Sequence, residues 1–488
     1  MEEINNCWPL RIIFLNLKSK PDKTSAMFAK ETYIDRRTAL IGEMKKLRQS
    51  GLLLFLGNDE SGMNYADNPY PFRQDSTFLY FFGLDFPGLA ALIDMEDGKV
   101  SVYTDELTID NIVWKGSLPV KELCSKAGVE HTGSMDELRS LLMKAEGKGR
   151  MVHFLPPYRG RHYVKMFNLT GLPGRAFDES VSIPFVKAVI NLRSHKSPEE
   201  VMQIEDAVNI SSDMNLAMIS MIHPGMSEAE VVSVVTGIAL RKGRGMAFPV
   251  IATVDGQILN NHWYGNIMQE GDLFLLNAGA ENRMHYAGDI SATAPVGKRF
   301  TDRQRMIYDI VLHAHTAAVE ALRPGVPFVD VHMRASEVLA EDLKSIGLMK
   351  GNVHEAVQEG AHALFFPNGL GHMLGLDVHD MEALGEAWVG YDGRPRSTKF
   401  GLKSLRLARE LEPGYVLTIE PGVYFIPELI DLWKSSGKFK DFLNYDEIEK
   451  FRDFGGFRIE RDYLILDNGN RRLGKYLPIT ADEVEAMR

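Results

Sequence analysis

The chain is poor in cysteine, in excess basic charge and in long apolar runs. Only Cys7 and Cys124 occur among its 488 residues, too few for a disulfide framework and in keeping with a reducing cytoplasm, where we expect the protein. The formal net charge of −11 argues against nucleic-acid binding, which requires a basic face. No apolar run reaches the roughly 18–20 residues of a membrane-spanning helix, so we expect no membrane partner.

Composition and sequence patterns predict a globular chain of two domains behind a short extension. The sequence from Met27 onward is typical of a natural protein start, so residues 1–26 are expected to be either a poorly ordered extension or the result of an upstream start codon. Their apolar stretch is interrupted by Arg11 and Asn16 and lacks a following cleavage site, which argues against a secretory signal. We predict an N-terminal domain over residues 27–185 and a C-terminal domain over residues 186–488.

The N-terminal domain alternates helical and strand patterns. Residues 33–49 have the periodicity of an amphipathic helix, and residues 51–56, 90–93 and 99–103 read as strands. In the C-terminal domain, capping-box sequences over 197–200, 227–230 and 301–304 predict three helix starts.

Two Pro-Gly turns, at His223 and at Arg323, lie 100 residues apart between helical segments. This spacing predicts two similar halves related by a pseudo-twofold axis. Apolar runs over residues 273–276 and 416–419 are predicted strands. The overall fold class is therefore α/β (α+β).

Five potential metal ligands lie in short sequence motifs at the ends of the predicted strands. They are Asn277, Asp289, His372, Glu420 and Glu460. Carboxylate oxygens with one imidazole suit divalent Mn²⁺, Co²⁺ or Zn²⁺. Such sets can hold one ion, or two ions roughly 3.5–4 Å apart.

The order of these residues and the phrases Gly-Leu-Gly-His-Met-Leu-Gly-Leu-Asp-Val-His-Asp, Ile-Glu-Pro-Gly and Phe-Arg-Ile-Glu resemble the pita-bread metallopeptidases, in the Xaa-Pro aminopeptidase and prolidase branch. The resemblance covers residues 27–488. It implies an N-terminal creatinase-like domain, a C-terminal pita-bread domain with pseudo-twofold halves, and a homodimer. It also implies hydrolysis of the bond between an N-terminal residue and proline, with proline-containing peptides as substrates and most suitably Mn²⁺ as the metal.

The chain departs from the family pattern at two asparagines. Asn277 stands where the family has its first aspartate, and twelve residues separate it from Asp289, one more than is usual. The intervening segment reads as a hairpin turn that would bring both side chains to one face. Two Asp, two Glu and one neutral His would supply a charge of −4, whereas this set supplies −3. Asn368 replaces a family histidine four residues before His372 and cannot carry a proton.

The same resemblance implies roles for further residues. Glu420 matches the general acid/base, and His262 and His379 match histidines that contact substrate and reaction intermediate. Arg406 matches the prolidase arginine that grips a dipeptide's free carboxylate, although a basic run in a solvated loop is an equal reading. Arg458, two residues before Glu460 and so on the same strand face, could orient a ligand carboxylate, and Asn368 remains a substrate contact.

Two other functions stay open. Because of the two asparagines, the alternative to the peptidase is a catalytically impaired pseudoenzyme, or a binding protein for proline-containing peptides with a weakened metal site. Creatinase, a fold relative that acts without metal, makes non-metal catalysis a third possibility.

Overall fold

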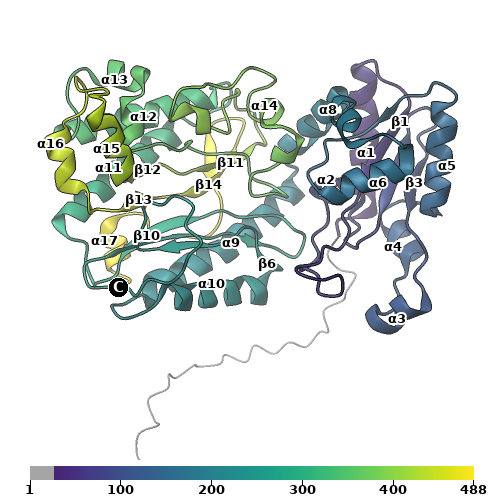
Figure 1. Ribbon diagram of the computed structural model, residues 1–488, viewed down its shortest axis with the longest axis horizontal. Coiled ribbons are helices and arrows are strands. Elements are labelled where there is room, and N and C mark those ends of the chain that lie inside the picture. Colours follow the sequence, from purple (N-terminus) through teal and green to yellow (C-terminus); the bar gives the residue numbers. More distant parts are fainter. Residues whose placement is uncertain (1–26) are drawn as a thin grey trace, which may run out of the picture.

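The computed structural model describes residues 27–488, so the extension expected over residues 1–26 lies outside the described residues. Two α/β parts lie side by side: the N-terminal domain on the right of Figure 1 and the larger C-terminal domain on the left. Within residues 27–488, no helix combines the length and the apolar character needed to cross a membrane.

The N-terminal domain is a five-stranded sheet with the strand order β4-β3-β2-β1-β5. The strands are β1 (Leu52–Leu56), β2 (Ala90–Asp94), β3 (Val100–Tyr103), β4 (His131–Gly133) and β5 (Val152–His153). The helices are α1 (Lys30–Lys46), α2 (Ser76–Phe82), α3 (Ile109–Lys115), α4 (Val120–Lys126), α5 (Met135–Glu146), α6 (Gly160–Thr170) and α7 (Gly174–Glu179). The predicted first helix and first three strands are confirmed, with ends shifted by a few residues.

Helix α8 (Ile183–Ser194) lies where the two domains meet (Figure 1). The domain boundary predicted at residues 185 and 186 falls inside this helix. Its Arg193 binds both domains, because the guanidinium donates to Thr77 Oγ1 at 2.8 Å and to Asp380 Oδ1 at 2.7 Å. Lys196 adds a second buried contact to Asp380, at 2.8 Å. These bonds fix the N-terminal domain against the loop that carries His379.

The C-terminal domain repeats one arrangement twice. Its long helices α9 (Pro198–Met221), α10 (Glu228–Lys242), α11 (Asp302–Ala321) and α12 (Phe328–Ser345) flank the strands on opposite sides of the view in Figure 1. The three predicted capping boxes are present. In the turn after α9, Gly225 N donates to Met268 O at 2.8 Å, and in the turn after α11, Gly325 N donates to Leu411 O at 2.8 Å. The predicted pseudo-twofold halves are thereby confirmed.

Each half contributes a three-stranded sheet. One has the order β10-β8-β7, and the other has the order β11-β14-β15. Nine residues after the matching carbonyls of Met268 and Leu411, the chain reaches Asn277 and Glu420, so these two positions are equivalent. A single bridge between Ser291 and Glu460 joins the two sheets. The candidate ligands therefore gather where the halves meet.

The strands of this domain are β6 (Gly245–Met246), β7 (Ile251–Thr253), β8 (Leu273–Asn277), β9 (Ala280–Glu281), β10 (Ser291–Pro295), β11 (Val416–Ile419), β12 (Gly422–Tyr424), β13 (Gly456–Arg458), β14 (Arg461–Ile465) and β15 (Asn470–Arg472). The shorter helices are α13 (Val353–Glu359), η1 (Ala361–Leu364), η2 (Glu382–Leu384), α14 (Glu386–Val389), η3 (Leu402–Ser404), α15 (Pro427–Ser435), α16 (Tyr445–Ile448), η4 (Glu449–Phe451) and α17 (Ala481–Glu485). Both predicted strands, β8 and β11, are confirmed.

Candidate metal centre

The segment from Asn277 to Asp289 is more elaborate than the simple hairpin turn that the sequence predicts. Asn277 ends β8 and pairs with Ser291 of β10, not with Asp289. The intervening loop contains β9, which pairs with β6. Asp289 lies just before β10, and its backbone N–H donates to Asp462 Oδ2 at 3.1 Å. The extra residues are thus folded into a second small sheet, while both candidate side chains remain within contact of each other.

His372 lies beside β11 and next to Glu420. Thr418 N donates to His372 O at 3.0 Å, and His372 N donates to Thr418 Oγ1 at 3.1 Å. The imidazole Nδ1 lies 3.0 Å from Met373 O. Because a carbonyl only accepts, Nδ1 carries the proton of the neutral ring, and Nε2 is left with a free lone pair, as a metal ligand needs.

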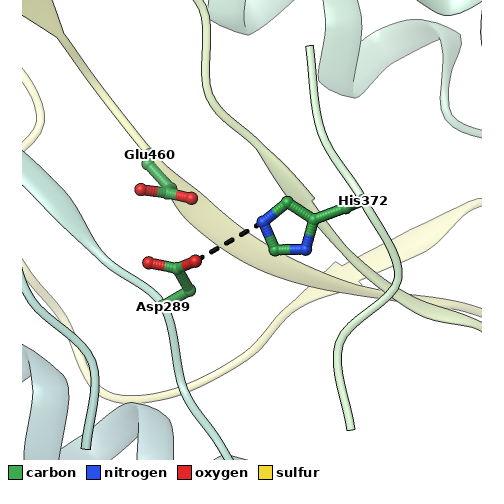
Figure 2. A group of neighbouring side chains, drawn as sticks. All are labelled: Asp289, His372 and Glu460. Carbon is green, nitrogen blue, oxygen red and sulfur yellow. Dashed lines mark ion pairs between the residues drawn. The ribbon is translucent and has the colours of Figure 1, made fainter. Parts of the chain in front are cut away.

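The side chains of Asp289, His372 and Glu460 point toward one another from three separate chain segments (Figure 2). One ligand atom of each lies within 4.8 Å of the others. His372 Nε2 is 3.4 Å from Asp289 Oδ2 and 3.6 Å from Glu420 Oε1. The structure therefore brings together four of the five predicted ligands as a three-carboxylate, one-imidazole set.

The carboxylates of this set are largely buried, and the nearby charge of Arg458 offsets their negative charge only in part. Burial raises the pKa of Asp289 to about 7. Burial and then the neighbouring charge of Glu460 raise the pKa of Glu420 to about 8, and burial and Asp289 raise that of Glu460 to about 7. Within residues 27–488, no Lys or Arg makes an ion pair with any of the three. Clustered acidic oxygens with a free imidazole nitrogen and an excess of negative charge fit a divalent cation.

Asn277, the fifth predicted ligand, presents its amide nitrogen rather than an oxygen to this set. Nδ2 lies 2.5 Å from Glu460 Oε2, 2.7 Å from Ser291 Oγ and 3.1 Å from Asp289 Oδ1, so its two hydrogens are shared among three acceptors. Carboxylate oxygens accept hydrogen bonds, and the amide turns its NH₂ group toward them. In this arrangement Asn277 is a donor to two ligands and is not itself a ligand.

His379 lies behind His372, with the ring centroids 4.3 Å apart. Its Nδ1 lies 3.3 Å from Glu382 Oε2, and Glu382 accepts from Arg406 Nη1 at 2.6 Å. Arg406 also donates to Glu386 Oε1 at 3.0 Å. Arg406 is thus linked to His379 through Glu382, with its guanidinium already held by two carboxylates. Burial, followed by the charge of His372, lowers the pKa of His379 to about 4.

Two predicted substrate residues lie outside the ligand cluster. His262 is exposed, and its Nδ1 lies 3.1 Å from Val250 O, next to the residue that pairs with Asn277. Asn368 donates to Gly369 O at 3.0 Å, and its Oδ1 is buried without a donor among the described residues.

The predicted contact of Arg458 with a ligand carboxylate is not formed in residues 27–488. Its Nε donates to Tyr424 Oη at 2.7 Å, and no ion pair links it to Glu420 or Glu460 in the described part of the chain. The reason is that Arg458 ends β13 while Glu460 follows the strand and bridges to Ser291. The two side chains therefore do not share one face of a continuous strand.

Three further residues support the centre and were not predicted. Ser291 Oγ donates to Glu460 Oε2 at 2.5 Å, Thr418 holds the backbone of His372, and Asp462 holds the backbone of Asp289. Burial and the charge of Asp289 raise the pKa of Asp462. Their spacing in the sequence could have indicated two of them, because Ser291 and Asp462 each follow a proposed ligand by two residues in an extended segment.

Comparison with known proteins places these features in a family. Residues 202–467 match the model of metallopeptidase family M24, and residues 33–153 match the aminopeptidase P N-terminal domain. The Xaa-Pro dipeptidase of Homo sapiens is 31% identical over 450 residues, covering 90% of this chain and 89% of that protein. The Xaa-Pro aminopeptidase of Escherichia coli is 30% identical over 478 residues, covering 94% and 98%.

A solved structure has the same fold over nearly the whole chain. Proline aminopeptidase P II from Yersinia pestis superposes with a TM-score of 0.77 at 27% sequence identity, covering 94% of this chain and 99% of that one. The two matched domains follow each other in the order of the two domains described above. The chain therefore belongs to metallopeptidase family M24, in the group that carries an aminopeptidase P N-terminal domain.

Proposed function

We propose that this chain is a metal-dependent peptidase that hydrolyses the bond between an N-terminal residue and proline, as an Xaa-Pro aminopeptidase or Xaa-Pro dipeptidase. The observation that carries the proposal is the cluster of Asp289, His372, Glu420 and Glu460, which makes no ion pair with a Lys or Arg in residues 27–488. The names of the relatives support the substrate class, since they act on Xaa-Pro bonds.

One divalent ion, most suitably Mn²⁺ with Co²⁺ or Zn²⁺ as alternatives, fits the four ligands. Such an ion supplies a Lewis acid for the scissile carbonyl and lowers the pKa of water. A second ion is disfavoured because Asn277 Nδ2 occupies Asp289 Oδ1 and Glu460 Oε2. The positive end of the amide dipole thus lies at these oxygens, where a second cation would otherwise bind.

Glu420 is the proposed general acid and base. Its carboxylate takes the proton of the attacking water and delivers it to the prolyl nitrogen, which leaves as a secondary amine. Its Oε1 lies 3.6 Å from His372 Nε2, so the carboxylate borders the space in which the ion and its water would be held.

His379 is proposed to position the substrate. In the neutral ring Nδ1–H donates to Glu382, so Nε2 faces outward as an acceptor for a substrate N–H. Only the protonated ring can donate to a developing oxyanion from Nε2. His262, exposed beside the end of β7, and Asn368, with its free carbonyl oxygen, are proposed as further substrate contacts.

Arg406 is proposed to bind the free carboxylate of an Xaa-Pro dipeptide. Its side chain is 39% exposed, so a substrate can reach the guanidinium. Its two glutamate partners compete for the same donors, and a substrate carboxylate must share or displace them. Arg458 is proposed to act through charge and not through direct contact, because its buried guanidinium interacts electrostatically with Glu420 and Glu460.

A second function is favoured by the Asn277 contacts. If the amide bonds to Asp289 and Glu460 exclude any ion, the chain is a pseudoenzyme that binds proline-containing peptides without cleaving them. The two functions differ in one measurable property, which is metal-dependent turnover.

An Xaa-Pro dipeptide hydrolysis assay with Mn²⁺, Co²⁺ or Zn²⁺ tests the proposal. Wild type should release proline, and Glu420→Gln, which keeps the side-chain shape, should not. Both proteins should keep the same thermal unfolding midpoint within a few degrees. Inactivity of wild type with all three ions, together with retained peptide binding by both proteins, decides for the binding-protein function.

We further propose a homodimer. Helix α3 buries none of its residues, and its Ile109, Val113 and Trp114 are 72%, 72% and 83% exposed. Apolar side chains gathered on one short helix are typical of a protein interface. Sedimentation of wild type as a dimer and of Trp114→Ser as a monomer is the expected result. The cytoplasmic location remains a prediction from the cysteine content.

A further inference from the structure

A cavity of about 370 Å³ lies between the two domains. The N-terminal domain contributes β1, the start of α2 and the segment that leads into α6, and the C-terminal domain contributes the loop that carries His379. None of the four proposed metal ligands lines it. His379 lines the cavity and its ring lies 4.3 Å from that of His372, so the cavity borders the metal centre without including a proposed ligand.

Most charged groups on the cavity wall are already paired. Arg73 Nε lies 2.5 Å from Glu281 Oε1, and Arg193 Nη2 lies 3.0 Å from Asp377 Oδ2. These four side chains need no ligand. Asp75 and Arg159 also line the wall and make no ion pair among residues 27–488, although the charges of Arg193 and Arg73 act on Asp75.

Asp75 and Arg159 have opposite signs and unused bonding capacity. Asp75 Oδ1 caps α2 by accepting from Phe78 N at 2.8 Å, while its Oδ2 accepts no hydrogen bond from residues 27–488. Arg159 forms no ion pair within the same residues, and its guanidinium lies 5.6 Å from the ring centre of Tyr158. The charge of Asp75 also reaches Tyr158, where it adds to burial in raising the tyrosine pKa. Tyr158 thus lies within range of both charges.

The remaining wall offers one polar group and several apolar ones. His162 is 4% exposed, and its Nε2 has no hydrogen-bond partner in the described part of the chain. Burial lowers its pKa to about 4, so the ring is neutral at pH 7 and can serve a ligand as donor or acceptor. Phe55, Phe154 and Met381 supply apolar surface.

We propose that this cavity binds a free α-amino acid or dipeptide with an apolar side chain, as its zwitterion. The ammonium group meets Asp75 Oδ2, the carboxylate meets Arg159, and the side chain lies on the aromatic wall. A cavity of roughly 150 Å³ already admits a benzene ring, so 370 Å³ accommodates a ligand of this class. The occupant would contact His379. The proposal concerns binding and does not depend on the proposed peptidase activity.

Isothermal titration calorimetry of the chelator-treated full chain with L-leucine tests the proposal. L-leucinamide keeps the ammonium and lacks the carboxylate, whereas N-acetyl-L-leucine keeps the carboxylate and lacks the ammonium. We expect one leucine per chain and a roughly 10- to 150-fold loss of affinity for each analogue, the effect of one charged hydrogen bond. Absence of leucine binding, or equal binding of all three compounds, overturns the proposal.

Two variants each remove the charge proposed to bind one end of the ligand. Asp75→Asn keeps a good cap for α2 but removes the charge, so it should weaken leucine and leucinamide and leave N-acetyl-leucine unchanged. Arg159→Gln should weaken leucine and N-acetyl-leucine and leave leucinamide unchanged. Arg161→Gln, exposed on the same helix and absent from the cavity wall, is the control and should change nothing. Leucine binding that needs Mn²⁺, or that is indifferent to Asp75→Asn, places the ligand at the metal centre and contradicts the proposal.

Discussion

Replacing Asn277 by aspartate is the most direct test of how the amide shapes the metal centre. The amide now donates to Asp289 Oδ1 at 3.1 Å and to Glu460 Oε2 at 2.5 Å. An aspartate would place a carboxylate oxygen at the position of the donor. In the metal-free protein two attractive contacts therefore become repulsive, and in the metal-bound protein a new ligand becomes available.

The size of the effect follows from the bonds that are lost. A hydrogen bond to a charged group contributes about 1.5–3 kcal/mol, so two bonds amount to roughly 3–6 kcal/mol of unfolding free energy. That is a large part of the roughly 5–15 kcal/mol available to a folded domain. An ion present at 100 times its Kd restores about 2.7 kcal/mol. We therefore expect Asn277→Asp to be much less stable than wild type in chelator and to gain more from Mn²⁺.

Thermal unfolding with chelator and with Mn²⁺, combined with metal analysis after dialysis, measures both parts. Wild type should retain at most one ion per chain, and Asn277→Asp should retain more. Asn58→Asp is the control, because Asn58 is also fully buried but lies in the N-terminal domain. It should lose stability without rescue by Mn²⁺. Equal stability of wild type and Asn277→Asp in chelator, with unchanged metal content, would refute the role assigned to the amide.

Two further predictions concern pH and substrate length. In the folded, metal-free chain the pKa values of Asp289, Glu420 and Glu460 are about 7, 8 and 7, above the ordinary values of the unfolded chain. The folded chain therefore binds more protons than the unfolded chain. Its thermal unfolding midpoint should fall as the pH rises from about 5 to 8. Saturating Mn²⁺ should reduce this decrease. An unfolding midpoint of the metal-free protein that rises over the same pH range contradicts the raised pKa values. Arg406→Ala should reduce kcat/KM for Xaa-Pro dipeptides by about 1.5–3 kcal/mol and spare Xaa-Pro-Xaa tripeptides, whereas an equal loss on both indicates a structural role.

The fold could be predicted largely from local signals. Capping residues Ser197, Ser227 and Thr301 begin the helices where expected, because a cap is decided by a few adjacent residues. The two Pro-Gly turns likewise announced the repeated halves. The small pairing of β6 with β9 could not be foreseen, since it joins short segments about 35 residues apart whose sequences carry no strand periodicity.

The candidate site divides in the same way. The identities of Asp289, His372 and Glu460 followed from short phrases, and the structure brings them together. The orientation of the Asn277 amide did not follow, because it depends on which acceptors surround it in space. The direct contact expected of Arg458 assumed one continuous strand, whereas the chain leaves β13 before it reaches Glu460.

The bridge between Ser291 and Glu460 has a consequence for the order in which the molecule folds. Ser291 and Glu460 are 169 residues apart in sequence, so closing this contact costs far more chain entropy than any local turn. An ion bound by both Asp289 and Glu460 would link the two ends of that loop. It would stabilise the closed chain in the way a long-range cross-link does. Chelation should therefore loosen the meeting of the two halves before it affects either helix pair, which amide hydrogen exchange can resolve segment by segment.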